Sequence, residues 1–122
     1  MKLHEQREQG YLFADYGPDF LKVNDQILRQ NLLLSPDRID TDWPARDFDS
    51  LEAAHFEYIL VLQPELVLLG TGTQLRFPHP RLLAPLSSQG IGVDVMDIGA
   101  ACRTYNILMS EGRRVVAAML LV

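Results

Sequence analysis

The stretch that decides the fold is "LVLLGTGTQL", residues 66–75. Its first four residues are apolar at every position, which is typical of a strand buried on both faces in a parallel sheet covered by helices. Gly70 and Gly72 then turn the chain sharply. A strand, a Gly-x-Gly turn and a helix are also how many proteins hold a nucleotide phosphate. The stretch therefore raises two hypotheses, a phosphate-binding loop and a tight turn that requires glycine.

Helix and strand signals alternate after this turn. They predict, in chain order, a helix, a strand, a helix and a strand over residues 80–90, 91–97, 99–112 and 113–122. Pro80 fits a first helical turn, whereas Pro85 would strain a helix interior. Gly112 is placed as a C-terminal helix stop. This order favours strands joined by crossover helices in the C-terminal half.

The N-terminal third contains many turn signals and short apolar runs. These runs predict β-strands at residues 12–13, 20–23 and 27–34. A capping-box pattern of Asp49 and Glu52, with Ser50 as the competing cap, predicts the start of a helix. No repeat or linker divides the chain, so we expect residues 1–122 to form a single α/β domain with a mixed central sheet and a β-rich N-terminal part.

Composition excludes several classes of function. The chain of 122 residues has a net charge of −5, and its eleven basic residues do not cluster beyond the pair Arg113 and Arg114. Nucleic-acid binders gain most of their affinity from basic patches, so no nucleic-acid partner is expected. The longest apolar runs fall far short of the ~20 residues that span a bilayer. No secretory or mitochondrial signal is evident, and we expect a cytoplasmic protein that does not span a membrane.

A candidate ligand-binding site follows from the predicted topology. If residues 66–69 and 93–96 form parallel neighbouring strands, their carboxyl ends lie at one edge of the sheet, where α/β proteins tend to bind ligands. Helical spacing puts Arg103, Asn106 and Ser110 on one polar stripe of the following helix. The candidate site comprises Gly70, Thr71, Gly72, Thr73, Asp97, Arg103 and Asn106.

The dinucleotide hypothesis fits this site poorly. The fingerprint G-x-G-x-x-G/A needs a small third residue, and Leu75 stands there. Pro78 and Pro80 postpone the helix that should aim its backbone amides at the phosphates. Asp97 does end the next strand, where such proteins hold a ribose. The sequence favours a tight turn with positive φ, and we expect no cofactor.

Catalytic and metal-binding constellations are incomplete. Cys102, the single cysteine, could form a catalytic triad with His79 or His55 and an aspartate. Its small neighbouring residues instead favour a packed thiol inside a helix. No two histidines have metal-ligand spacing, so no metal site is expected. Arg103 is expected to clamp the carboxylate of Asp97. The alternative is that it receives an anionic ligand or an acidic residue of a partner.

Four stretches carry a resemblance to a known family: "DYGPDFLKVND" (15–25), "LLLSPDRIDTDW" (32–43), "LLGTGTQLRFPHP" (68–80) and "VMDIGAACRTYNILMSEGRRVVAAML" (95–120). From about Tyr16 onward, the chain resembles the small-domain family that includes mitochondrial complex I assembly factor three. Most bacterial and archaeal relatives in this family are described as domains of unknown function. The chain departs from the resemblance at Ile98, where many relatives are expected to have threonine.

The resemblance implies a three-layer α/β fold and a function in protein contacts, with no catalytic residues to carry over. Because family membership alone does not fix function, two hypotheses stay open. The first is a non-enzymatic interaction or assembly factor whose protein partners include subunits of a membrane complex. The second is a small-ligand binder, or an enzyme, that uses the sheet edge at Gly70–Thr73 and Asp97–Asn106. A homodimer is compatible with both.

Overall fold

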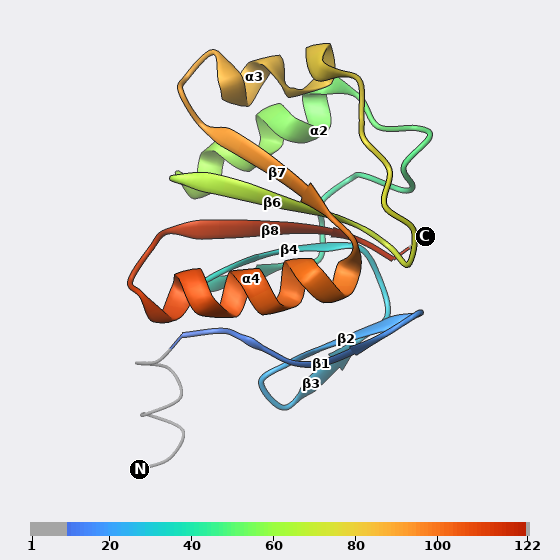
Figure 1. The fold of residues 1–122 in the computed structure, drawn as a ribbon, viewed down its shortest axis with the longest axis vertical. Helices are drawn as coiled ribbons and strands as arrows, with labels where there is room; N and C mark the ends of the chain where they lie inside the picture. The colour runs from blue at the N-terminus through green and yellow to red at the C-terminus, as the bar shows by residue number, and fades with distance from the viewer. Residues whose placement is uncertain (1–9, 122) are drawn as a thin grey trace.

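The structure, a computed structural model, describes residues 10–121. A five-stranded mixed sheet forms its centre (Figure 1). The strands lie in the order β5 (Arg38–Asp40), β4 (Leu32–Ser35), β8 (Val115–Leu120), β6 (Leu66–Thr71) and β7 (Gly92–Met96). β6 is parallel to both β7 and β8, whereas β4 is antiparallel to both β5 and β8. The predicted mixed sheet is therefore confirmed.

A second, antiparallel sheet holds the N-terminal strands in the order β1 (Phe13–Gly17), β2 (Phe20–Val23) and β3 (Gln26–Leu28). The strand predicted at residues 27–34 is instead divided between β3 and β4, which belong to different sheets. Asn31 anchors the crossing between them. Its amide nitrogen donates to the carbonyl oxygens of Ala45 and Arg46, and its side-chain oxygen accepts from the Leu121 N–H. These side-chain bonds replace strand pairing at this point.

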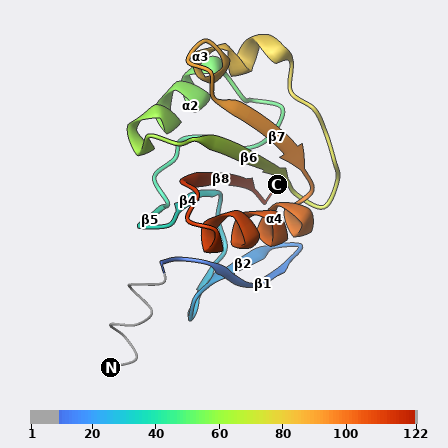
Figure 2. The same ribbon diagram turned by 60° about the vertical axis from the view of Figure 1, so that its left-hand side comes forward.

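Helices cover both faces of the five-stranded sheet (Figures 1 and 2). One face carries α2 (Ala53–Glu57), η1 (Tyr58–Leu62), η2 (Pro80–Leu83) and α3 (Ala84–Ser87). The other face carries α4 (Ile98–Ser110), and the three-stranded sheet packs against the outer side of α4. The fold is three-layered as predicted, with the small sheet added beyond one helical layer. Within residues 10–121, every helix is too short or too polar to cross a membrane.

Two helix predictions need correction. The cap of α2 is Glu52, whose N–H donates to Nδ1 of His55 at 3.0 Å, so the capping pair is Glu52 and His55 rather than Asp49 and Glu52. The helix predicted at residues 80–90 divides into the 3-10 helix η2 and the single turn α3. Pro85 lies at the start of α3, where the missing N–H of proline has no helical partner to lose.

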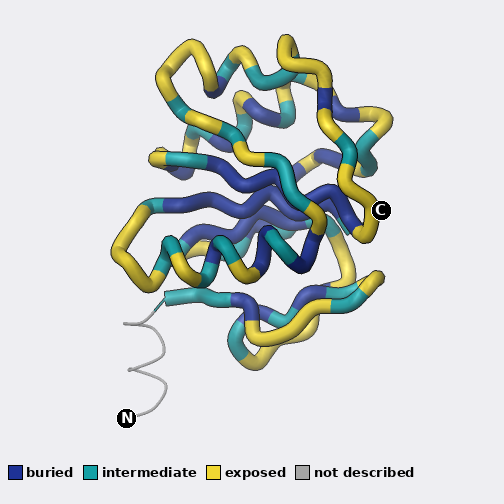
Figure 3. The backbone as a smooth tube through the Cα atoms, viewed as in Figure 1, coloured by how far each residue is buried: buried dark blue, intermediate teal, exposed yellow. Residues whose placement is uncertain are grey.

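The core lies on both faces of the sheet. The central strands are accordingly buried, as their dark blue colour in Figure 3 shows. Side chains alternate along β8: Val116, Ala118 and Leu120 pack towards α2 and α3. Val115, Ala117 and Met119 pack towards α4. All six are completely buried, which explains why the C-terminal run is apolar without alternation.

Candidate functional site

The carboxyl ends of β6 and β7 meet at one edge of the sheet, as predicted. Gly70 pairs in register with Met96, and the N–H of Ile98 donates to the Gly72 carbonyl oxygen at 2.8 Å. Gly72 has φ of +74°, a conformation that favours glycine. The chain then runs through a loop until η2 begins at Pro80. Because no helix starts at the glycines, this stretch is a tight turn and lacks the geometry of a dinucleotide loop.

Thr71 and Gly70 stabilise the turn from the protein interior, Thr71 through hydrogen bonds and Gly70 through close packing. The hydroxyl of Thr71, a residue only 3% exposed, donates to the Gln74 carbonyl oxygen at 2.8 Å and accepts from the Arg76 N–H at 3.2 Å. A Cβ atom at Gly70 would lie 2.8 Å from the sulfur of Met119. Both residues therefore fix the backbone, and neither lines the cleft at this edge.

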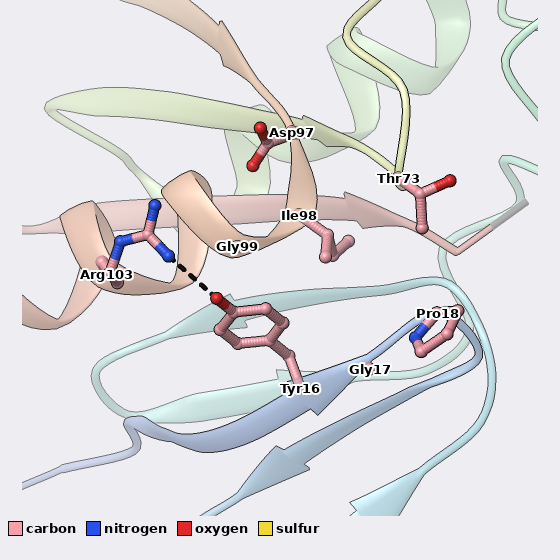
Figure 4. Close-up of a pocket in the computed structure, with 9 residues that line it drawn as sticks. Tyr16, Gly17, Pro18, Thr73, Asp97, Ile98, Gly99 and Arg103 are labelled. Atoms are coloured by element: carbon pink, nitrogen blue, oxygen red, sulfur yellow. Dashed lines mark hydrogen bonds between the residues drawn. The ribbon is translucent and has the colours of Figure 1, made fainter.

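The cleft, of about 400 Å³, opens between the β1–β2 turn, the glycine turn and the start of α4 (Figure 4). It is lined by Tyr16, Gly17, Pro18, Gly72, Thr73, Asp97, Ile98, Gly99 and Arg103. We call this set the Tyr16–Arg103 cleft. Four of the seven candidate residues line it: Gly72, Thr73, Asp97 and Arg103.

Arg103 is not clamped by Asp97, contrary to expectation. Nη1 of Arg103 donates a hydrogen bond of 2.8 Å to the Tyr16 hydroxyl (Figure 4). The carboxylate of Asp97 instead caps α4 by accepting from the Ala100 N–H at 2.8 Å. Helix capping satisfies a backbone donor that has no partner within the helix, and here it takes the carboxylate away from the arginine.

Asn106 lies outside the cleft. Its side-chain oxygen accepts from the Phe13 N–H at 2.9 Å, and its amide nitrogen donates to the Phe13 carbonyl oxygen at 2.8 Å. This two-bond contact attaches β1 to α4. The polar stripe of the helix therefore splits into an anchoring residue, Asn106, and a cleft residue, Arg103.

The sequence reasoning missed the contribution of the β1–β2 turn. The sequence predicts no part in the site for Tyr16, Gly17 and Pro18, although the end of β1 brings the Tyr16 ring over Gly99. A Cβ atom at residue 99 would lie 2.7 Å from the Tyr16 hydroxyl oxygen. The one sequence signal for this contact is a glycine in the first turn of an amphipathic helix, and that signal does not identify the residue packed against it.

Cys102 is packed inside the protein, as expected. Burial raises the pKa of its thiol to about 12, with the neighbouring Arg103 acting weakly in the opposite direction. The Nδ1 atoms of His55 and His79 accept backbone N–H bonds from Glu52 and Arg81, respectively. The residues proposed for a cysteine triad are thus not assembled. Among residues 10–121, no group of three or more His, Cys, Asp and Glu residues is arranged to hold a metal ion.

The cleft offers one guanidinium, one carboxylate, a phenol hydroxyl and exposed apolar edges. These groups can recognise a polar or charged group through hydrogen bonds. Fold and cleft together define a small mixed α/β protein with a cleft at the carboxyl edge of its parallel strands.

Comparison with known proteins identifies the family. Residues 13–120 match the model described as "Protein of unknown function (DUF498/DUF598)", and the chain belongs to this family. The "13 kDa major membrane protein" of Francisella tularensis is 35% identical over 123 residues, covering 94% of this chain and 95% of that protein. The zebrafish (Danio rerio) protein named NADH dehydrogenase (ubiquinone) 1 alpha subcomplex assembly factor 3 is 29% identical over 119 residues. That match covers 97% of this chain and 68% of that protein.

Solved structures share the fold. The solution structure of a Xanthomonas campestris protein superposes with a TM-score of 0.83 at 42% identity, covering 91% of this chain and 84% of that one. The crystal structure of a Bordetella parapertussis protein gives a TM-score of 0.85 at 35% identity, covering 91% and 95%, respectively. The predicted fold is therefore confirmed, and the family match and the zebrafish relative confirm the resemblance to the family that includes the assembly factor.

Proposed function

We propose that this protein is a non-enzymatic interaction factor that helps to assemble a multi-subunit respiratory membrane complex. One observation carries the proposal: 97% of the chain aligns with a protein named as a NADH dehydrogenase assembly factor. The Tyr16–Arg103 cleft supports it, because the cleft presents recognition groups without a nucleophile and base in contact.

Arg103 is the residue through which the cleft binds its protein partner in this proposal. Arg103 is exposed and uses Nη1 to hold Tyr16, which leaves the N–H donors of Nε and Nη2 without a hydrogen-bond partner among the described residues. Such a pair of N–H donors binds a carboxylate with two parallel hydrogen bonds. The partner group is therefore an aspartate, a glutamate or a C-terminal carboxylate.

Affinity capture from the native cell, with chemical cross-linking and mass spectrometry, tests this proposal. The wild-type chain should recover subunits of a membrane complex, and Arg103→Glu should lose them. Arg46→Glu is the matched control, because Arg46 is also exposed and makes no side-chain ion pair among the described residues. Failure to recover any reproducible membrane-complex subunit with the wild-type chain would contradict the proposal.

The size of the cleft favours a second candidate function, the binding of a small organic anion beside Arg103. A thermal-shift screen against nucleotides and small carboxylates tests it. A ligand at a hundred times its dissociation constant should add about 2.7 kcal/mol to the unfolding free energy. Arg103→Ala should abolish that shift, and the absence of any shift across the panel would rule this candidate out.

A further inference from the structure

The outer edge of the five-stranded sheet is formed by β7. Within the part of the chain that the structure describes, β7 pairs with β6 on one side and with no strand on the other (Figures 1 and 2). No backbone hydrogen bond joins it to the neighbouring segment 77–83 in that same part. Alternate N–H and C=O groups of β7 therefore point outward without a protein partner, and such an edge can accept a further strand.

An apolar groove of about 800 Å³ runs beside this edge. Phe77, Pro78 and Leu83 lie on one side of it, with His79 and Pro80. On the β7 side it is lined by Val93, Val95 and Met96, and Asp94 also borders it. The Phe77 side chain is 70% exposed, an unusual state for a phenylalanine with so much apolar surface nearby. A strand added to β7 would place alternate side chains in this groove, where they would cover Phe77.

Asp94 lies in the middle of β7. Val93 and Val95 pack with the core on the α2 and α3 side, so the alternation of the strand puts Asp94 on the opposite face, where it pairs in register with Leu68. Asp94 is exposed, and its carboxylate makes no ion pair with the other described residues. A residue directly across from it in an added strand would be attracted if basic and repelled if acidic.

This charge disfavours a second copy of the chain as the occupant. The longest twofold antiparallel pairing of β7 with itself is centred on Asp94 and would set two carboxylates opposite each other. Like charges directly opposite destabilise a strand pair, and the net charge of −5 on each copy adds repulsion. A charged residue in an edge strand is a known protection against self-pairing.

We propose that β7 and its groove bind an extended segment of a partner protein with the pattern apolar–basic–apolar. The lysine or arginine lies opposite Asp94, and the two apolar side chains enter the groove beside Val93, Val95 and Phe77. The backbone of the segment continues the sheet. This surface shares no lining residue with the Tyr16–Arg103 cleft. The inference therefore goes beyond the proposed function, and either of the two can be wrong while the other holds.

Two synthetic peptides test the proposal, acetyl-Thr-Thr-Val-Lys-Val-Thr-Thr-amide and the same peptide with glutamate in place of lysine. Titrations are followed by the backbone amide signals of the isotope-labelled protein. The lysine peptide should shift the amides of β7 and of residues 77–83, and it should bind roughly fivefold more tightly than the glutamate peptide. Asp94→Lys should reverse this preference.

Asp25→Lys is the matched control, because it changes the net charge equally at an exposed turn in the three-stranded sheet. It should leave the preference for the lysine peptide in place. Phe77→Ala should weaken both peptides to a similar extent, since the groove contacts are apolar. The proposal is overturned if neither peptide shifts β7, if Asp94→Lys leaves the preference unchanged, or if the free protein dimerises through β7.

Discussion

The Tyr16 hydroxyl accepts a hydrogen bond from Nη1 of Arg103 at 2.8 Å, and this bond joins residues 87 positions apart in the chain. It links the end of β1 to the first turns of α4, and the tyrosine ring lies over Gly99. The contact closes one side of the cleft. The shape of the cleft therefore depends on the absence of a side chain at Gly99, which leaves room for the Tyr16 ring.

Gly99→Ala tests this dependence. The new methyl group would displace the end of the Tyr16 side chain, which is partly exposed and can turn towards solvent when its bond to Arg103 breaks. Alanine also favours the helix by up to roughly 1 kcal/mol, so we expect the unfolding free energy to change by less than about 1 kcal/mol. The Tyr16 ring signals should shift strongly in NMR spectra. Gly92→Ala, where nothing lies within 4 Å, should leave them unchanged; unmoved Tyr16 signals in Gly99→Ala would contradict the packing.

Asn106→Ala should detach β1 from α4. The substitution removes the hydrogen bonds to the N–H and to the carbonyl oxygen of Phe13, a buried residue. At about 1 kcal/mol for each bond, the expected loss is about 2 kcal/mol in urea unfolding. Ser110→Ala on the same helix should cost much less, because its hydroxyl only bonds the Ile107 carbonyl oxygen within α4. Equal losses in the two variants would show that Asn106 does not anchor β1.

Asp37 gives a pH-dependent prediction. The hydrogen bond from the Ser35 hydroxyl, and more weakly the positive charge of Arg114, lowers the pKa of its carboxyl below the ordinary value of 3.8. A lowered folded-state pKa means that Asp37 stabilises the fold above pH 3.8 and that this contribution is lost as the pH falls through the depressed pKa. An NMR titration of the wild type should give an Asp37 pKa below 3.8. Ser35→Ala should raise the Asp37 pKa towards 3.8.

Glu65 is the internal control for that titration. Its pKa is also lowered, first by the hydrogen bond from Arg113, and Ser35 takes no part in that contact. The Glu65 pKa should therefore be the same in the wild type and in Ser35→Ala. A wild-type Asp37 pKa at or above 3.8 would refute the role of the serine.

Cys102 should resist thiol reagents while the protein is folded. Burial raises its pKa to about 12, so almost no thiolate is present at neutral pH and the sulfur is shielded from reagent. Modification by a disulfide reagent should follow the unfolding curve in urea. Rapid modification of the native protein at neutral pH would reopen the case for a reactive cysteine.

Much of the fold could be predicted from the sequence because its strongest signals are local. The apolar runs within residues 66–69 and 113–122 form the buried parallel strands β6 and β8. The tight turn predicted at Gly72 and the helix stop predicted at Gly112 both have positive φ. The division of residues 27–34 between two sheets could not be predicted, because it depends on bonds from Asn31 to residues far along the chain.

The candidate site was half predictable for the same reason. Strand order placed Gly72, Thr73, Asp97 and Arg103 at one edge, and the structure brings them together. The hydrogen-bond partner of each polar side chain depends on the tertiary structure. Arg103 forms a hydrogen bond with Tyr16 and not with Asp97, although Asp97 is nearer in the sequence. The Asp97 carboxylate instead caps α4. Nothing in the local sequence distinguishes these two outcomes.

The amount of assembled respiratory complex in cells that lack this protein tests the central claim most directly. Native gel electrophoresis of membranes should show less assembled NADH dehydrogenase after depletion. Re-expression of the wild-type chain should restore it, Arg46→Glu should restore it equally, and Arg103→Glu should not. An unchanged amount of every respiratory membrane complex after complete depletion would contradict the proposed assembly function.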